Sequence, residues 1–233
     1  MLKLAVASAL LGLCLASLQN VERVTQNYDD EVNNKIVLQI QYELKASYMY
    51  QAYSHYFGRA DVALPGFAKW FEKASLEERQ HATGLIEYIN KRGGTVSLNN
   101  LNFNNMCTTV SQELSKMKEF ERGHACICTF MSSQKEISPS EKSLPPCPAR
   151  STWQNGLWAM QDTLALERFV NDELLKLHTT AGVKKDPHLS HILEHDYLDE
   201  QVNSISQVAN YIRQLERVGD DGLGEYLFDK SLE

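Results

Sequence analysis

Residues 65–94 read PGFAKWFEKASLEERQHATGLIEYINKRGG, and the fold class follows from this stretch. Pro65 suits the first turn of a helix, and a basic last turn followed by Gly93-Gly94 suits its end. Between them, apolar residues at helical spacing share one arc of a helical wheel: Phe67, Phe71, Ala74, Leu85 and Ile89. Glu78 and His81 fall inside the same arc. The stretch therefore predicts a long helix whose buried face carries a carboxylate and an imidazole.

The same signals predict the rest of the fold. Three further long helices are expected over residues 30–57, 151–182 and 187–219, with a short tail helix over 222–230. Gly58 ends the first of these, Ser151 is placed to cap the second, and Asp186-Pro187 supplies an N-cap and first-turn proline for the third. No stretch alternates as a strand does. We predict an all-α fold, a four-helix bundle with a short fifth C-terminal helix.

Composition excludes several classes of protein. The chain has 233 residues, of which 43% are hydrophobic and 23% charged, with 12 glycines and 6 prolines, so it is neither disordered nor collagen-like. Its formal charge is −7 and its pI about 5.5. We therefore expect no nucleic-acid partner and no membrane partner. An acidic chain suits a carrier or a protein that handles cations.

The other three long helices also carry a polar residue where a core residue is expected. Their wheels place Glu43 with Val32, Ile36, Ile40 and Tyr50; Glu167 with Met160, Leu164 and Leu174; and Gln201 with Tyr197, Leu198, Ile205, Val208, Ile212 and Leu215. An ionised carboxylate buried without a partner costs several kcal/mol. Carboxylates that converge in a core are explained by a cation between them. Oxygen ligands with one imidazole favour iron, with manganese or zinc as alternatives.

Each signal has a plainer interpretation when it is taken alone. A single buried glutamate is commonly one half of an ion pair. The pattern Glu-x-x-His, which puts both side chains on one helix face, also occurs at Glu121 and His124, where no apolar stripe accompanies it. The coincidence of polar positions on four helices is what favours a metal centre.

The N-terminus and the cysteines indicate an oxidising compartment. Residues 1–16 have the lysine, apolar run and small residues of a signal peptide, with cleavage expected after Ala16 or Ser17; a buried N-terminal helix is the alternative. Four cysteines remain, Cys107, Cys126, Cys128 and Cys147, which favours two disulfides. Three pairings are open, and a metal clip at the Cys-x-Cys pair is the alternative. All four lie in a proline-rich segment, residues 102–149, which we expect to be an insert on the surface.

Seven stretches resemble one family, the ferritins. They are residues 42–50, 61–71, 77–81, 91–94, 186–189, 197–202 and 224–230, and they span nearly the whole of the expected mature chain, residues 17–233. The leader and the insert make the chain look most like the secreted yolk ferritins of gastropod snails. The resemblance implies a ferritin-like diiron domain assembled as a hollow 24-mer around a ferric mineral core.

The resemblance also implies a ferroxidase centre that uses Fe(II) and O₂ as substrates. Glu43, Glu78 and His81 match the ligands of the first iron. Glu78 also bridges to a second iron, which Glu167 holds. Gln201 lies close to the iron pair and is expected among the metal-binding residues, and Tyr50 matches the tyrosine that hydrogen-bonds near the pair. The chain keeps the ligands that catalytically idle subunits lose.

Three departures from the family pattern concern iron entry, mineral growth and the insert. Gln80 and Thr83 stand where acids that seed mineral are usual, although Glu77 is kept. Glu194 and His188 fit the lining of the three-fold channels through which iron is thought to enter, but His191 replaces an aspartate, and this predicts pH-sensitive entry. The insert is either a tolerated surface decoration or a patch for an uptake receptor.

The function expected is therefore that of a secreted ferroxidase that stores iron, accumulated in yolk granules as an iron reserve. A catalytically idle yolk storage ferritin is the second interpretation. A secreted four-helix signalling protein is a third, and the converging carboxylates argue against it, since the core of such a protein has no use for them.

Overall fold

A computed structural model describes residues 24–98, 101, 155–219 and 221–233. Three predictions lie outside these residues: the signal peptide, the cysteine-rich insert with its disulfides, and the second Glu-x-x-His pattern at Glu121 and His124. Within the described ranges the chain forms helices and no strands, which confirms the all-α prediction. None of the helices in those ranges is long and apolar enough to cross a bilayer.

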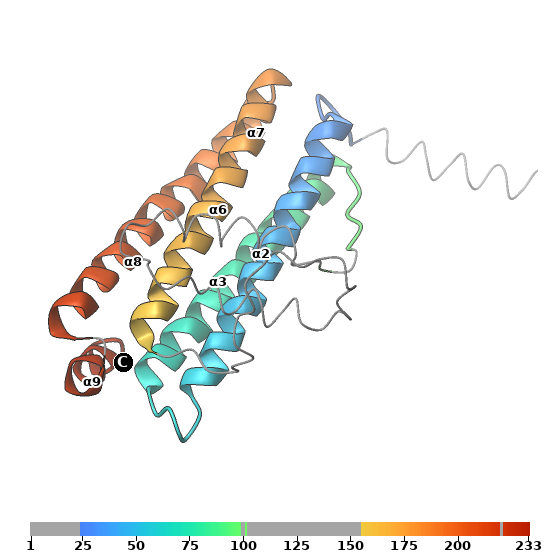
Figure 1. Cartoon of the computed structure of the whole chain (residues 1–233). Helices are drawn as coiled ribbons and strands as arrows, with labels where there is room; N and C mark the ends of the chain where they lie inside the picture. The colour runs from blue at the N-terminus through green and yellow to red at the C-terminus, as the bar shows by residue number, and fades with distance from the viewer. Residues whose placement is uncertain (1–23, 99–100, 102–154, 220) are drawn as a thin grey trace, which may run out of the picture.

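The helices follow the predicted order, as Figure 1 shows. They are α2 (Asp30–Phe57), α3 (Pro65–Arg92), α6 (Gly156–Val183), α7 (Pro187–Ile192), the π-helical segment η1 (Leu193–Leu198), α8 (Asp199–Val218) and α9 (Gly222–Ser231). In Figure 1, α2 lies beside α3 and α6 beside α8, and α9 lies at the end of the bundle where α3 and α6 begin. The predicted tail helix over 222–230 is thus confirmed as α9.

Aromatic rings fill the core at one end of the bundle. Phe71 is fully buried, and its ring centroid lies 4.9 Å from that of Tyr53 and 5.7 Å from that of Phe57. Phe57 in turn stacks on Phe67 at 5.0 Å, and Phe67 contacts Phe228 of α9 at 5.6 Å. These rings connect α2, α3 and α9 in one continuous core, whose burial is the main stabilising contribution.

A buried aspartate fastens α9 to the start of α3. Leu64 occupies the N-cap position of α3 but provides no side-chain cap. Asp229 takes over this role from α9, because its Oδ1 accepts a hydrogen bond of 2.9 Å from the Phe67 amide. Gly66 allows the close approach, since a Cβ built there would lie 1.9 Å from the Asp229 carbonyl oxygen. The two helix ends therefore fit together only with glycine at this position.

Helix α6 begins later than the sequence predicted. Its N-cap is Asn155, four residues beyond the Ser151 that we expected, and the Asn155 side chain accepts a 3.0 Å hydrogen bond from the Trp158 amide. The Gly156 amide donates to Glu225 of α9 at 2.6 Å, so a second otherwise unpaired donor is satisfied from another helix. Both asparagine and serine make good caps, and nothing local in the sequence distinguishes them.

Replacing Asn155 with alanine is expected to lower the free energy of unfolding by about 1 kcal/mol, because the Trp158 amide loses its acceptor. Urea unfolding of the iron-free protein measures the change. Asn155→Asp keeps an acceptor and serves as the control. If the alanine variant is as stable as the aspartate variant, the cap contributes nothing.

The predicted fourth helix is not a uniform α-helix, and this corrects the sequence prediction. Between α7 and α8 the chain takes one wider π turn, η1. Leu189, Leu193, Tyr197 and Gln201 are all buried at intervals of four residues. In an α-helix, four residues rotate the side-chain direction by about 40° more than one full turn, so residues at this spacing gradually turn away from the buried face. The wider turn removes part of that drift, and π turns are frequent at functional sites.

Candidate metal centre

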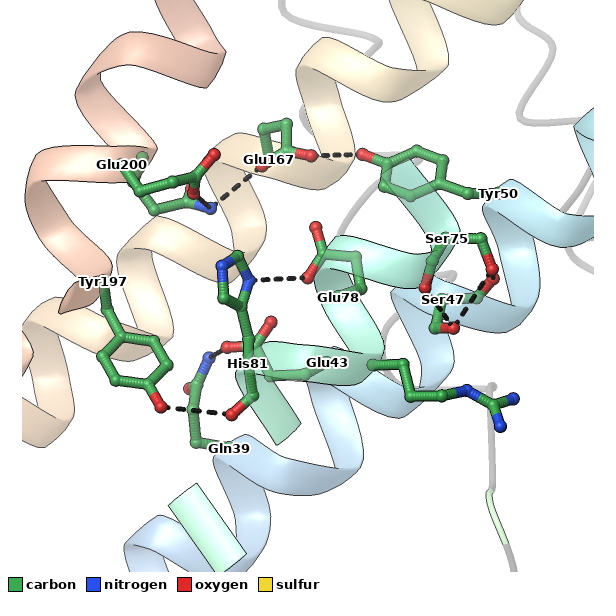
Figure 2. Close-up of polar contacts among 12 residues, drawn as sticks. Gln39, Glu43, Ser47, Tyr50, Ser75, Glu78, His81, Glu167, Tyr197 and Glu200 are labelled. Carbon is green, nitrogen blue, oxygen red and sulfur yellow. Dashed lines mark hydrogen bonds and ion pairs between the residues drawn. The ribbon is translucent and has the colours of Figure 1, made fainter. Parts of the chain in front are cut away.

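The polar residues singled out by the helical wheels lie in the core, as predicted. Glu43 on α2, Glu78 on α3, Glu167 on α6 and Gln201 on α8 are all buried. His81 lies one turn after Glu78, and its side chain is 19% exposed. Figure 2 shows Glu43, Glu78, His81 and Glu167 pointing into a common space between the helices. Residues from four separate segments of the chain therefore meet at one place.

Three of these residues form a group with the dimensions of a metal site. Glu43, Glu78 and His81 each offer one ligand atom, and these atoms all lie within 4.8 Å of one another. His81 Nδ1 lies 3.5 Å from Glu78 Oε2, and Gln39 donates to Glu43 Oε1 at 2.7 Å. Glu43 Oε2 and Glu78 Oε2 are buried and have no hydrogen-bond partner among the described residues. Two buried acceptors without donors are what a cation would satisfy.

Glu167 is held from both sides. The Tyr50 hydroxyl donates to its Oε1, and Gln201 Nε2 donates to its Oε2 at 3.0 Å. Figure 2 shows the Tyr50 contact, which joins α2 to α6. These contacts fix the orientation of the carboxylate, as hydrogen bonds to a side chain that binds a metal do. The arrangement is asymmetric, because one side offers two carboxylates and an imidazole and the other a single oriented carboxylate.

Electrostatics also favour a bound cation. Burial, together with the negative charge of Glu78, raises the pKa of Glu43 well above its usual range. Burial and the charge of Glu167 do the same to the pKa of Glu78. Burial raises the pKa of Glu167 to about 7, although the hydrogen bond from Tyr50 opposes the rise. Without a cation these carboxylates repel one another in a medium that solvates them poorly, and a bound cation removes that penalty.

The raised pKa values predict how the stability of the iron-free protein depends on pH. Glu167 binds a proton more tightly in the folded state than in the unfolded state, so its contribution is present at low pH and is lost as pH rises. The window runs from about 4.5 to about 7. Chemical unfolding across this range should show a smaller loss of stability for Glu167→Gln than for the wild type. Identical slopes would mean that this carboxylate has an ordinary pKa.

Sequence reasoning missed three residues that belong to this region. Glu200 is half-buried, burial raises its pKa, and its charge acts on both Glu78 and Glu167. Gln39 orients Glu43, and Tyr197 donates to the backbone carbonyl of His81 at 3.1 Å. Gln39 lies one helical turn before Glu43, and this spacing was the one available signal. Glu200 could not be found from a helical wheel, because it stands about 100° from Gln201, outside the arc of buried residues, and is itself only half-buried.

The structure also places the residues at which the sequence departs from the family pattern. Gln80 and Thr83 are exposed on α3. His191 and Glu194 line an open hollow of about 500 Å³ at the junction of α6 and α7, and His178 Nε2 lies 2.6 Å from Glu194 Oε1. His188 is not in this lining, because its ring stacks on Tyr88 with the centroids 5.8 Å apart. The described chain thus brings two of the three expected channel residues together.

Comparison with known proteins agrees with this geometry. The ferritin-like domain family matches residues 33–128 and 129–218. Yolk ferritin of Lymnaea stagnalis is 47% identical over 199 residues, which cover 84% of this chain and 80% of the relative. Soma ferritin of the same snail is 39% identical over 211 residues, which cover 91% of this chain and 95% of the relative. The helical bundle, the buried carboxylates and these similarities agree, and the chain belongs to the ferritin family.

Proposed function

We propose that this ferritin is a secreted ferroxidase that stores iron in yolk. It oxidises Fe(II) with O₂ at a diiron centre and keeps the product as a ferric mineral inside a 24-subunit shell. Ferritins as a family bind iron, have ferroxidase activity and assemble into oligomeric shells. The observation that supports catalysis in this chain is the group of buried ligand atoms of Glu43, Glu78 and His81 beside the oriented carboxylate of Glu167.

Each residue has a role in this proposal. Glu43, Glu78 and His81 hold the first Fe(II), and the second oxygen of Glu78 reaches the other iron, which Glu167 holds. Tyr50 and Gln201 orient Glu167 through the hydrogen bonds they donate to its two oxygens. Two Fe(II) ions held close together each give one electron to the same O₂. The protein supplies the geometry and the negative charge, and iron carries the redox step.

The raised carboxylate pKa values link iron binding to proton release. At a pH near 7, Glu167 is partly protonated in the iron-free protein, because its pKa is about 7. Fe(II) binds the ionised form, so each binding event releases protons. Glu200, which is half-buried beside Gln201, adds negative charge on this side of the centre and favours the arrival of cations.

Separate observations support the proposals that this ferritin is secreted and that it stores iron in yolk. A relative that is 47% identical is named a yolk ferritin. The leader expected at residues 1–16 supports secretion, and the four cysteines of residues 107–147 support disulfides formed outside the cytosol. Mass measurement of the mature protein gives the cleavage point and the number of disulfides. Size-exclusion chromatography distinguishes a 24-mer from a single subunit.

The test of catalysis is Fe(II) oxidation by the purified protein, followed as O₂ consumption and Fe(III) absorbance. We expect fast oxidation with about two Fe(II) used per O₂, and its loss in the double variant Glu43→Ala, His81→Ala. The matched control is His55→Ala, Glu72→Ala, which removes the same residue types from exposed positions of the same two helices. Equal slow rates in all three proteins would instead identify a catalytically idle storage ferritin.

A further inference from the structure

A second tyrosine–carboxylate pair lies in the core, and the proposed iron chemistry does not use it. Tyr53 on α2 is 1% exposed, and Asp162 on α6 is 4% exposed. The Tyr53 hydroxyl donates a hydrogen bond to Asp162 Oδ2. Asp162 Oδ1 is buried and has no hydrogen-bond partner among the described residues. The pair therefore contains one phenolic proton and one carboxylate oxygen that remains free to accept a proton.

Packing alone does not explain this aspartate. Burying a carboxylate is unfavourable, and an apolar residue of similar size serves a core better. Burial raises the pKa of Asp162 to about 7, while the hydrogen bond from Tyr53 opposes the rise. A metal does not explain it either, since the group of potential metal ligands found in the described part of the chain is Glu43, Glu78 and His81. A phenol donating to a buried carboxylate is the arrangement that removes the proton of a tyrosine when the tyrosine is oxidised.

The pair is connected to the candidate metal centre through an aromatic ring. Tyr53 follows Tyr50 by three residues, so both side chains lie on the same face of α2. The Phe71 ring packs against both, with its centroid 4.9 Å from that of Tyr53 and 6.0 Å from that of Tyr50. Tyr50 donates to Glu167 as Tyr53 donates to Asp162. Two tyrosine–carboxylate pairs thus join α2 to α6 on successive turns, one at the centre and one beyond it.

We propose that Tyr53 and Asp162 form a proton-coupled electron donor that serves the metal centre. The step breaks the O–H bond of Tyr53 and forms an O–H bond on Asp162. Tyr53 loses one electron, and the partially reduced dioxygen at the centre gains it. The proton stays inside the pair. This inference rests on the proposed function only for the oxidant, because the pair itself is complete without iron.

Burial gives the pair a property that an exposed tyrosine lacks. Both partners are almost fully buried, so the transferred proton remains on Asp162 beside the oxidised ring. It can return when the ring is reduced again, and the radical is shielded from reductants in solution. Tyr48 and Tyr226, by contrast, are about half exposed, at 52% and 51%. A radical on Tyr53 should therefore survive a water-soluble reductant, whereas radicals on exposed tyrosines should not.

The experiment uses the iron-free full-length protein and a photogenerated ruthenium(III) complex as the oxidant, with ascorbate added to remove exposed radicals. Electron paramagnetic resonance then measures the tyrosyl radical that remains. Every protein in this series carries Tyr50→Phe, because Tyr50 is equally buried and donates to Glu167 in the same way, so its radical would also be protected. In this background we expect a protected radical when Tyr53 is present and its loss in Tyr53→Phe. Asp162→Asn keeps a hydrogen-bond acceptor but cannot hold the proton, so it should lose the same signal. Tyr56→Phe, one turn further along α2, is the matched control and should keep it.

An unchanged protected radical in Tyr53→Phe would overturn the proposal, and so would full retention of the signal in Asp162→Asn. Circular dichroism and gel filtration establish that each variant folds, and Tyr53→Phe, which removes a single oxygen, carries the test if Asp162→Asn does not. A parallel measurement with Fe(II) and O₂ separates the two hypotheses. A wild type that oxidises iron without any Tyr53 radical refutes the donor role alone. A wild type that forms the radical by light but does not oxidise iron refutes the ferroxidase function alone.

Discussion

Replacing Glu78 with glutamine is expected to lower the rate of iron oxidation by about 100-fold or more while making the iron-free protein more stable by about 1–2 kcal/mol. In the proposed centre Glu78 is shared between two iron ions, and the rate should fall because a carboxamide does not replace such a carboxylate. Stability rises because Glu78 is buried beside Glu43, and each carries an oxygen without a hydrogen-bond partner. A glutamine amide removes one negative charge and can donate to Glu43. Iron oxidation and urea unfolding of the same preparations measure the two effects.

The two effects have opposite signs, and this makes the result informative. Glu72→Gln is the control, since it makes the same chemical change at an exposed position of α3 and should alter neither quantity. A variant with less stability and less activity would mean that Glu78 holds the fold together rather than the metal. A stable variant with normal oxidation would place the iron site elsewhere. Opposite changes are the signature of a strained site retained for function.

The fold and most of the candidate site could be predicted because both depend on periodicity. Glu43, Glu78 and Glu167 were found from helical wheels, which require only that each helix have a regular phase. The structure buries all three, together with the apolar residues of the same arcs. Their roles as iron ligands remain predictions. The ends of α3 were also predicted, because Pro65 and Gly93 act locally; Gly93 adopts the left-handed conformation, with a φ of 78°.

What could not be predicted depends on contacts between distant segments. Asp229 caps α3 across a separation of 162 residues. Tyr53 and Asp162 pair across 109 residues, and neither falls in a pattern that marks it as polar core. The π turn could not be predicted, because its residues include no proline or glycine to mark a change in the phase of the helix. Glu200 was missed because it lies outside the buried arc of its helix and is itself only half-buried. Such features require the relative placement of helices, which a single sequence does not provide.

Phe71 connects the core to the candidate site, and replacing it with alanine is expected to lower the free energy of unfolding by about 3–5 kcal/mol. Its ring is fully buried and packs against Tyr50, Tyr53 and Phe57, so its removal leaves a cavity beside both tyrosines. Iron oxidation should slow as well, since Tyr50 then holds Glu167 less firmly. Denaturant unfolding of the iron-free protein gives the first quantity, with Glu72→Ala as the neighbouring exposed control, expected to change stability by less than about 0.5 kcal/mol. A loss below about 1 kcal/mol would mean that the rings repack around the gap. In that case another aromatic ring contacts Tyr50 and Tyr53 in place of Phe71, and the candidate site does not depend on this one ring.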